Sequence, residues 1–315
     1  MKIGYFADGI WSHLALEKIT KDERFEIAFI VPRYDSVDSV LRQWANQLGV
    51  DFFTFRNVNS SSSIEKLQEY KADVFVSMSF DQILKKDFLK CPKLGVINCH
   101  AGALPFYRGR NVLNWVLING ASDFGVTVHY VDECVDTGDI IMQKQYPITE
   151  YDTYRTILDR ASIACAEILH ESLVKIYNGS VEPTPQSTIH PVGFYCGRRI
   201  DGDEWIDWQW SSRRIFNFIR GITDPGPCAC TAINGFKVKI KSSSLISDAV
   251  SYIGTPGEVV GVKKSGIWVK TGDSVILLNE IELGENYRLS IGKRFQSKQD
   301  FLMFHLKNRL NELND

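Results

Sequence analysis

Short apolar runs alternate with amphipathic stretches along the first half of the chain. Stretches that begin near Ser12, Ser36 and Ser62 combine a helix-capping residue with an apolar period of about 3.6 residues. Between them lie apolar runs typical of strands buried on both faces, at residues 2–7, 25–31, 51–55, 73–80 and 95–100. Strands that alternate with helices predict an α/β fold with a doubly wound, mostly parallel sheet, as in Rossmann-like domains.

The pattern continues beyond residue 100 and then changes. Further elements are expected at 111–119 (helix), 125–131 and 140–148 (strands) and 152–177 (helix). A segment rich in Gly, Pro, Ser and Thr at 178–193 predicts a domain boundary. The expected domains are 1–180 and 203–315, joined by a linker at 181–202.

The second domain has shorter elements. It opens on an amphipathic helix that Ser211 caps, with Ile215, Phe218 and Ile219 on one face. Closely spaced strands with glycine turns follow, at 236–242, 257–264, 266–272 and 274–283. This spacing predicts a small β-barrel-like (OB-like) domain. The terminal stretch 299–313 is an amphipathic helix, which either packs on its own domain or serves an oligomer interface.

The overall charge narrows the class of partner. The net charge is −2 and the calculated pI is near 6.3, so no global basic field favours nucleic acid or an anionic membrane. The chain opens directly on a strand, and no apolar run approaches the ~20 residues of a membrane span. Seven scattered cysteines show neither a disulfide framework nor metal-ligand spacing. We therefore expect a reduced cytoplasmic protein that binds no metal, and a homodimer as the commonest assembly.

Two polar clusters follow predicted strands. Asn98 and His100 end the strand at 95–100 and point to the same side of it. Downstream, "VDECVDTGDII" places Asp132, Asp136 and Asp139 around a Thr-Gly turn. Taken singly, a strand-end Asn and His often only cap loops, and D-x-G-D is ordinary turn chemistry.

Taken together, the two clusters supply the parts for acyl transfer to an amine. His100 suits removal of the amine proton because the unperturbed pKa of histidine, ~6.5, lies near working pH. A carboxylate beside it, Asp136 by preference, would stabilise the imidazolium and fix the tautomer. The Asn98 amide can donate to the developing oxyanion. The other histidines, at 13, 129, 170, 190 and 305, are interpreted as structural.

These motifs resemble those of the N10-formyltetrahydrofolate-dependent formyltransferases. "NCHAGALPFYRG", with "DTGD" 36 residues after the histidine, is similar to the family's Asn-x-His strand end, Arg-Gly loop and D-x-G-D loop. The resemblance implies catalytic roles for Asn98, His100 and Asp136. "YRGRNVLNWVLING" and "CGRRIDGDEWIDW" look most like the enzymes that formylate nucleotide-linked amino sugars. The family's "DPWPGAF" segment departs here to "DPGPCAC" at 224–230, so no role is carried over to it.

The resemblance also implies a slot for the folate donor. This slot would lie between the end of the fourth strand and the D-x-G-D loop, where backbone groups read the pterin edge and apolar side chains form walls. For the apolar members, ordinary core packing is the alternative. The expected cofactor-binding residues are Met78, Phe80, Asp81, Gln82, Ile83, Leu84, Leu104, Val135, Thr137 and Gly138.

A nucleotide-sugar acceptor carries two phosphates, which arginine recognises through its bidentate fork. Trp11, at the same sheet edge, suits stacking on a sugar or base, or packing of its loop. Arg108 has an alternative role, in which it pins its loop to backbone carbonyls. The expected substrate-binding residues are Trp11, Tyr107, Arg108, Gly109, Arg110, Arg198 and Arg220.

The sequence therefore predicts an enzyme that formylates a nucleotide-linked amino-deoxy sugar, with dTDP-4-amino-4,6-dideoxyglucose as the expected acceptor, in surface-polysaccharide synthesis. The first alternative is a methionyl-tRNA formyltransferase. Enzymes of that kind carry a basic Gly-rich insertion after the second strand, where this chain has only "VPRYDSVDSV". The second alternative is a non-catalytic protein that binds folate or a nucleotide sugar.

Overall fold

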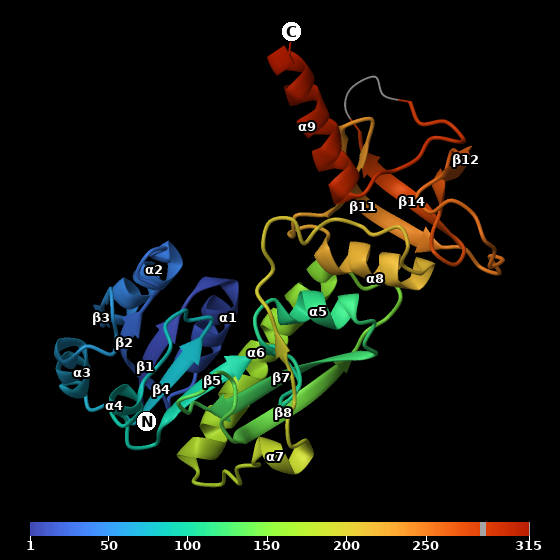
Figure 1. Cartoon of the computed structure of the whole chain (residues 1–315). Coiled ribbons are helices and arrows are strands. Elements are labelled where there is room, and N and C mark those ends of the chain that lie inside the picture. Colours follow the sequence, from blue (N-terminus) through green and yellow to red (C-terminus); the bar gives the residue numbers. More distant parts are fainter. Residues whose placement is uncertain (284–287, 315) are drawn as a thin grey trace. The chain divides into compact units, whose positions relative to one another are not determined.

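The computed structural model describes residues 1–283 and 288–314, which form two compact units (Figure 1). Unit 1 comprises residues 1–112, 123–147 and 158–197, and unit 2 comprises 113–122, 148–157 and the chain from 198 onward. Residues 181–197, expected as part of a linker, thus belong to unit 1. Residues 113–122 group with unit 2, where the Asn114 side chain donates to the Gly221 carbonyl at 2.7 Å.

A seven-stranded sheet forms the centre of unit 1 (Figure 1), in the order β3-β2-β1-β4-β5-β7-β8. The first five strands in this order are parallel, whereas β7 and β8 are antiparallel. The predicted mostly parallel sheet is confirmed. Its strands are β1 (Lys2–Ala7), β2 (Glu26–Val31), β3 (Asp51–Phe52), β4 (Val74–Met78), β5 (Val96–His100), β7 (Asp123–Tyr130) and β8 (Ile140–Pro147).

Helices flank this sheet (Figure 1): α1 (Gly9–Thr20), α2 (Ser39–Leu48), α3 (Ser61–Gln68), α4 (Lys86–Leu89), α6 (Tyr154–Tyr177) and α7 (Gln186–Ile189). α1 begins three residues before Ser12, whose hydroxyl donates to the Gly9 carbonyl instead of capping the helix. α2 begins after Asp38, whose carboxylate accepts from two backbone amides of the first turn. β3 is shorter than predicted, and beyond it Phe53 and Phe55 stack on each other with ring centroids 5.3 Å apart.

Strand pairing brings the polar residues together. β5 lies between parallel β4 and antiparallel β7, and Asn98 is paired with Ser77 on one side and His129 on the other. His100, two residues on, is paired with Thr127 of β7. A separate two-stranded parallel pair, β6 (Arg108–Gly109) with β9 (Tyr195–Cys196), holds residues 195–196 against the loop that follows β5.

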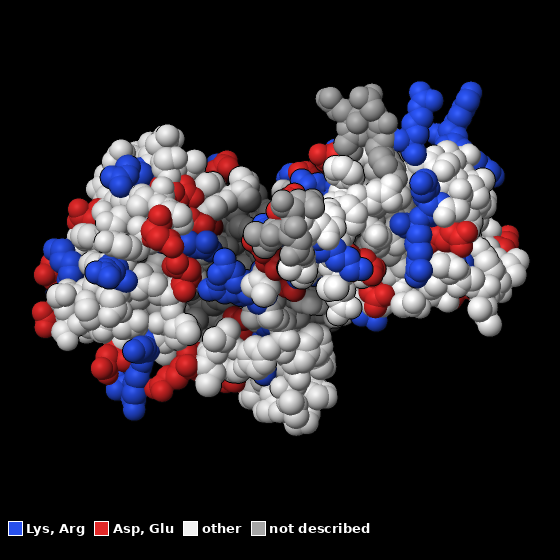
Figure 2. Space-filling model, turned by 45° about the horizontal axis from the view of Figure 1, so that its top comes forward, with Lys and Arg blue, Asp and Glu red and all other residues white. Residues whose placement is uncertain are grey.

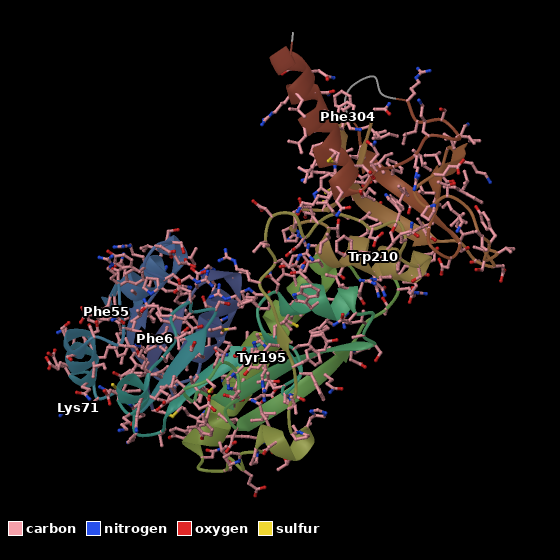
Figure 3. The ribbon with its side chains drawn as sticks, viewed as in Figure 1. Phe6, Phe55, Lys71, Tyr195, Trp210 and Phe304 are labelled. Atoms are coloured by element: carbon pink, nitrogen blue, oxygen red, sulfur yellow. The ribbon has the colours of Figure 1, made fainter. Side chains whose placement is uncertain are left out.

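Unit 2 is built around a five-stranded antiparallel sheet in the order β10-β11-β14-β13-β12. Ile215, Phe218 and Ile219 are buried in its core, as the pattern of the helix predicted. Phe304 is labelled on the terminal helix in Figure 3; four other apolar side chains of that helix, Leu302, Met303, Leu306 and Leu310, are exposed. The elements are α5 (Val112–Ile118), α8 (Ser212–Ile222), β10 (Ala229–Ile233), β11 (Phe236–Leu245), β12 (Val259–Lys263), β13 (Gly266–Lys270), β14 (Val275–Glu282) and α9 (Lys298–Asn314).

Within residues 1–283 and 288–314, none of the helices combines the length and apolarity that a membrane span requires. The same residues contain no group of three or more His, Cys, Asp or Glu side chains placed to hold a metal ion.

Candidate active site

His100 closes β5 and is buried, with an oxygen facing each nitrogen of its ring. Its Nδ1 lies 3.7 Å from Oδ2 of Asp136, and its Nε2 lies 2.7 Å from the carbonyl oxygen of Tyr107. Because a carbonyl only accepts hydrogen bonds, Nε2 carries the proton in this contact. Gly102 makes the approach possible, since a Cβ there would lie 2.6 Å from both Nε2 and the Tyr107 oxygen.

Asp136 reaches His100 because the loop between β7 and β8 folds back on itself. Gly138 packs on the Tyr130 carbonyl so tightly that a Cβ would lie 1.9 Å from its oxygen. Asp136 itself has a left-handed backbone, with φ +55°. Its Oδ2 accepts from the Gly109 amide at 2.8 Å. The carboxylate therefore lies within ion-pairing distance of the His100 imidazole, at 3.7 Å, but beyond hydrogen-bonding distance.

The charge state of Asp136 follows from its neighbours. Burial raises its pKa, but the positive charge that His100 and His129 carry when they are protonated, together with the Gly109 amide, outweighs burial and holds the pKa well below the ordinary range. The carboxylate is therefore ionised at neutral pH, as required of a group that balances a positive imidazolium.

Asn98 is half-buried, and its amide is oriented by His129. Nδ1 of His129 lies 2.7 Å from the Tyr130 carbonyl, so Nδ1 carries the proton and Nε2 presents a lone pair. Nδ2 of Asn98 lies 3.2 Å from this Nε2 and donates to it. The same Nε2 is 3.6 Å from Oδ1 of Asp136. His129 thus contacts two of the three expected catalytic side chains.

The sequence-based interpretation treated His129 as structural, and the structure places its ring against Asn98 and Asp136. The residue enters the site because β7 runs antiparallel to β5 and places His129 directly beside Asn98. The alternating pattern of 125–131 indicates a strand, but it does not say which strand lies beside it or in what register.

The ionised Asp136 has a measurable consequence for stability. Its pKa is lowered on folding, so it stabilises the fold above its unfolded pKa of ~3.9, and this contribution is lost as pH falls toward the folded pKa. Urea unfolding of the wild type and of Asp136→Asn should show that the pH-dependent part of their difference is greatest above about pH 4 and shrinks in more acidic buffer. A difference that stays constant from pH 7 down to the acid limit would contradict the assigned charge state.

Several of the apolar residues expected to bind the cofactor are packed within the protein. Met78, Leu84 and Leu104 are almost fully buried in the core, which is the alternative considered for them. Phe80 packs edge-on against Phe6, with ring centroids 5.6 Å apart. Their contact with a cofactor stays a prediction, and the structure supplies a packing role for each.

Polar members of the expected set also have partners within the chain. The Gln82 side chain accepts from the Val58 amide and donates to the Phe55 carbonyl, both at 2.9 Å. The Thr137 hydroxyl donates to Asp132. These contacts shape the loops after β4 and β7 on which the remaining candidates lie.

Three of the expected residues remain available to a ligand. Ile83 and Val135 are exposed, at 64% and 44%, which is unusual for large aliphatic side chains. Oδ1 of Asp81 is buried and has no hydrogen-bond partner among the described residues. A buried oxygen without a donor is costly unless a ligand or water supplies one.

The expected substrate-binding residues of unit 1 differ in their surroundings. Arg108 is buried, and its guanidinium donates hydrogen bonds to the Gln186 side chain and the Val192 carbonyl. Its contact with a substrate stays a prediction. Tyr107 packs edge-on against Phe194, at 4.8 Å between centroids, and Gly109 donates to Asp136. Arg110 is exposed next to this segment, and Trp11 is half-buried on α1.

In unit 2, Arg220 is buried and donates to the Thr149 carbonyl at 2.7 Å and to Asn217 at 3.0 Å. Burial lowers its pKa. These contacts tie α8 to residues 149–152 of its own unit. Arg198 is exposed.

Comparison with known proteins agrees with this fold. A family model described as "Formyl transferase" matches residues 1–174, and one described as "Formyl transferase, C-terminal domain" matches residues 200–299. The methionyl-tRNA formyltransferase of Fusobacterium nucleatum subsp. nucleatum is 33% identical over 288 residues, which are 89% of this chain and 91% of that protein. The enzyme of the same name from Bacillus subtilis (strain 168) is 33% identical over 263 residues, 83% of this chain and 79% of the relative.

Solved structures share the fold. An N-formyltransferase from Helicobacter canadensis, in complex with folinic acid and dTDP-3-aminofucose, superposes with a TM-score of 0.69 at 24% identity, over 89% of this chain and 100% of that chain. A sugar N-formyltransferase from Shewanella gives a TM-score of 0.59 at 21% identity, over 78% and 99%. The chain belongs to the formyl transferase family and is an N-formyltransferase.

Proposed function

We propose that this enzyme transfers a formyl group from N10-formyltetrahydrofolate to the amino group of a nucleotide-linked amino-deoxy sugar. The proposed acceptor is dTDP-4-amino-4,6-dideoxyglucose, and the proposed role is surface-polysaccharide synthesis by a cytoplasmic homodimer. The observation that carries the chemistry is the convergence of Asn98, His100 and Asp136 from β5 and the β7–β8 loop.

Three side chains divide the work of formyl transfer. The folate donor supplies the formyl group as an activated amide. For Nε2 of His100 to accept the proton that the attacking amine loses, the ring must leave the Tyr107 carbonyl and carry its own proton on Nδ1, which faces Asp136. The bond between the formyl carbon and N10 of the donor then breaks, and the proton taken by His100 passes to the leaving nitrogen, so that tetrahydrofolate departs. Asp136 balances the charge of the resulting imidazolium. Asn98 has a second N–H beyond the one given to His129, and this N–H donates to the oxygen on which negative charge develops.

The residues that remain available fit the folate donor. Asp81 offers its unpartnered buried oxygen to N–H groups of a pterin edge, while Ile83 and Val135 offer apolar contact to a planar ring. Phe80 and Val131, from the same two loops, pack on one apolar cluster, which supports a slot between the loops.

His129 should matter through Asn98 and Asp136 and not through contact with substrate. His129→Leu removes the acceptor for the Asn98 amide, so we expect kcat to fall about 10-fold as the oxyanion donor loses its orientation. His129→Gln retains an amide oxygen able to accept from Asn98 and should recover most of the loss. Steady-state kinetics with both substrates measures this effect. Equal kcat values in the leucine variant and the wild type would contradict it.

Charge supports a small acceptor over a tRNA. The chain carries 36 Lys and Arg against 38 Asp and Glu. The connection after β2, residues 32–38, has one arginine and two aspartates, and Arg33 donates to the Ser79 carbonyl at 2.9 Å and pairs with Asp8 at 3.4 Å. Acidic and basic side chains are interspersed on the face of unit 1 that Figure 2 shows. A partner with a dense phosphate backbone is bound through a basic surface.

The second candidate acceptor is methionyl-tRNA, which is favoured by the 33% identity to enzymes of that name. The test incubates the protein and formyl donor in parallel with charged initiator tRNA and with UDP- and dTDP-linked 3-amino and 4-amino sugars, and follows loss of the free amine. Turnover of a dTDP-linked 4-amino sugar supports the proposal, and selective turnover of the tRNA refutes it. Binding without turnover of any acceptor would favour the non-catalytic alternative. Within the sugar panel, Arg110→Ala and Arg198→Ala test the exposed arginines as phosphate contacts.

A further inference from the structure

A segment that neither family match covers takes part in the active site. The matches end at residue 174 and resume at residue 200. Between them, α7 and β9 fold onto unit 1, where β9 pairs with β6 and the ring of Tyr195 (labelled in Figure 3) lies 5.4 Å below the Arg108 guanidinium. This connecting segment therefore has a defined place beside the loop that follows β5.

Gln186, the first residue of α7, connects this segment to the catalytic loop. It is 3% exposed, and its Nε2 donates to the carbonyl oxygens of Asp136 at 2.9 Å and Gly138 at 2.8 Å. Its Oε1 accepts from Nε and Nη2 of Arg108 at 3.1 and 2.7 Å. An amide has two N–H donors and two oxygen lone pairs, so Gln186 uses its whole hydrogen-bonding capacity.

Arg108 connects Gln186 to the two backbone groups that contact His100 and Asp136. Its Nη1 donates to the Val192 carbonyl at 3.2 Å and its backbone amide to the Phe194 carbonyl at 3.1 Å. The residue before it, Tyr107, presents the carbonyl that meets His100, and the residue after it, Gly109, presents the amide that meets Asp136. Arg108 thus lies between the two residues whose backbone groups contact His100 and Asp136, and Gln186 holds the Arg108 side chain.

We propose that Gln186 is a positioning residue for formyl transfer, which sets the place of Asp136 directly and the places of the Tyr107 carbonyl and the Gly109 amide through Arg108. This inference rests on the proposed roles of His100 and Asp136. Only a neutral amide meets both demands: glutamate at position 186 would keep the acceptor for Arg108 but would face the Asp136 and Gly138 carbonyls with oxygens that cannot donate.

A double-mutant cycle tests the proposal. Gln186→Leu should lower kcat about 10- to 100-fold, the usual cost of a displaced catalytic group, with the acceptor KM changed less than about threefold. In an Asp136→Asn background the same substitution should cost less than about threefold, because the group it positions is already disabled. Gln186→Glu should behave like Gln186→Leu, and Gln47→Leu, an exposed glutamine on α2, is the matched control. A full additional loss in the Asp136→Asn background, or an unchanged kcat in Gln186→Leu, overturns the proposal.

A second readout separates this inference from the proposed acceptor and from misfolding. Amide hydrogen exchange needs no substrate, and in Gln186→Leu it should accelerate in residues 132–139 and 106–110 while the main sheet keeps its protection. Acceleration confined to these segments supports the positioning role even if the wild type uses none of the acceptors tested, an outcome that would refute only the proposed function. Unchanged exchange in both segments, or exchange raised across the whole of unit 1, overturns the positioning role.

Discussion

Replacing His100 by asparagine should lower kcat at least ~10²-fold, the scale that acid–base assistance supplies. Asparagine is smaller, can still accept from or donate to neighbouring groups, and leaves the ionised Asp136 with a polar neighbour, so the fold should survive. What it cannot do is take a proton from the attacking amine. Single-turnover kinetics with a saturating formyl donor and amino-sugar acceptor measures the chemical step apart from product release.

The pH profile makes this expectation specific. The wild-type rate should fall in acid as the base becomes protonated, and this acid limb should be absent in His100→Asn. His305→Asn, which alters an exposed histidine of α9, is the matched control and should keep the wild-type rate and profile. Near-normal turnover by His100→Asn would refute the assignment of the base and leave Asp136 without a catalytic partner.

Sequence patterns predicted those features of the site that lie close together in the chain. Apolar runs separated by helical periodicity predicted the parallel sheet, and side-chain alternation predicted that Asn98 and His100 share one side of β5. The meeting of His100 with Asp136 was inferred from the chemistry that the two motifs allow and from a family resemblance. The contact itself depends on a loop that folds back over Gly138, and this folding is a tertiary feature.

His129 and Gln186 were not predicted, for the same physical reason. Each acts on the site through a partner far away in the chain: Asn98 lies 31 residues from His129, and Arg108 lies 78 residues from Gln186. Strand register and the path of a Pro-rich connection determine these contacts, and the local pattern of apolar residues predicts neither of them. A glutamine in a segment rich in Gly, Pro, Ser and Thr is read as a solvated linker residue, whereas here it is among the most buried polar side chains of unit 1.

The residues expected to bind the cofactor show a second feature that sequence patterns do not predict. Apolar side chains at a strand end have the same pattern whether they face a core or a ligand slot. Burial separates them, because Met78 and Leu104 are enclosed whereas Ile83 and Val135 are exposed. The distinction depends on which neighbours cover each side chain, so a single sequence cannot make it.

Asn98→Ala should lower kcat by ~10²–10³, as expected when a preorganised oxyanion donor is removed. The acceptor KM should change little, because Asn98 is assigned to charge that develops only as the amine attacks. The Asn98 amide also donates a hydrogen bond to His129, so His129→Leu is the necessary comparison. That substitution disturbs the orientation of the oxyanion donor but leaves the donor present, and it should lower kcat about 10-fold. Asn46→Ala, at an exposed position on α2, controls for the loss of an amide as such. If Asn98→Ala and His129→Leu cost the same, Asn98 acts only by holding His129 in place; a loss at least ~10-fold greater in Asn98→Ala identifies the amide itself as the oxyanion donor.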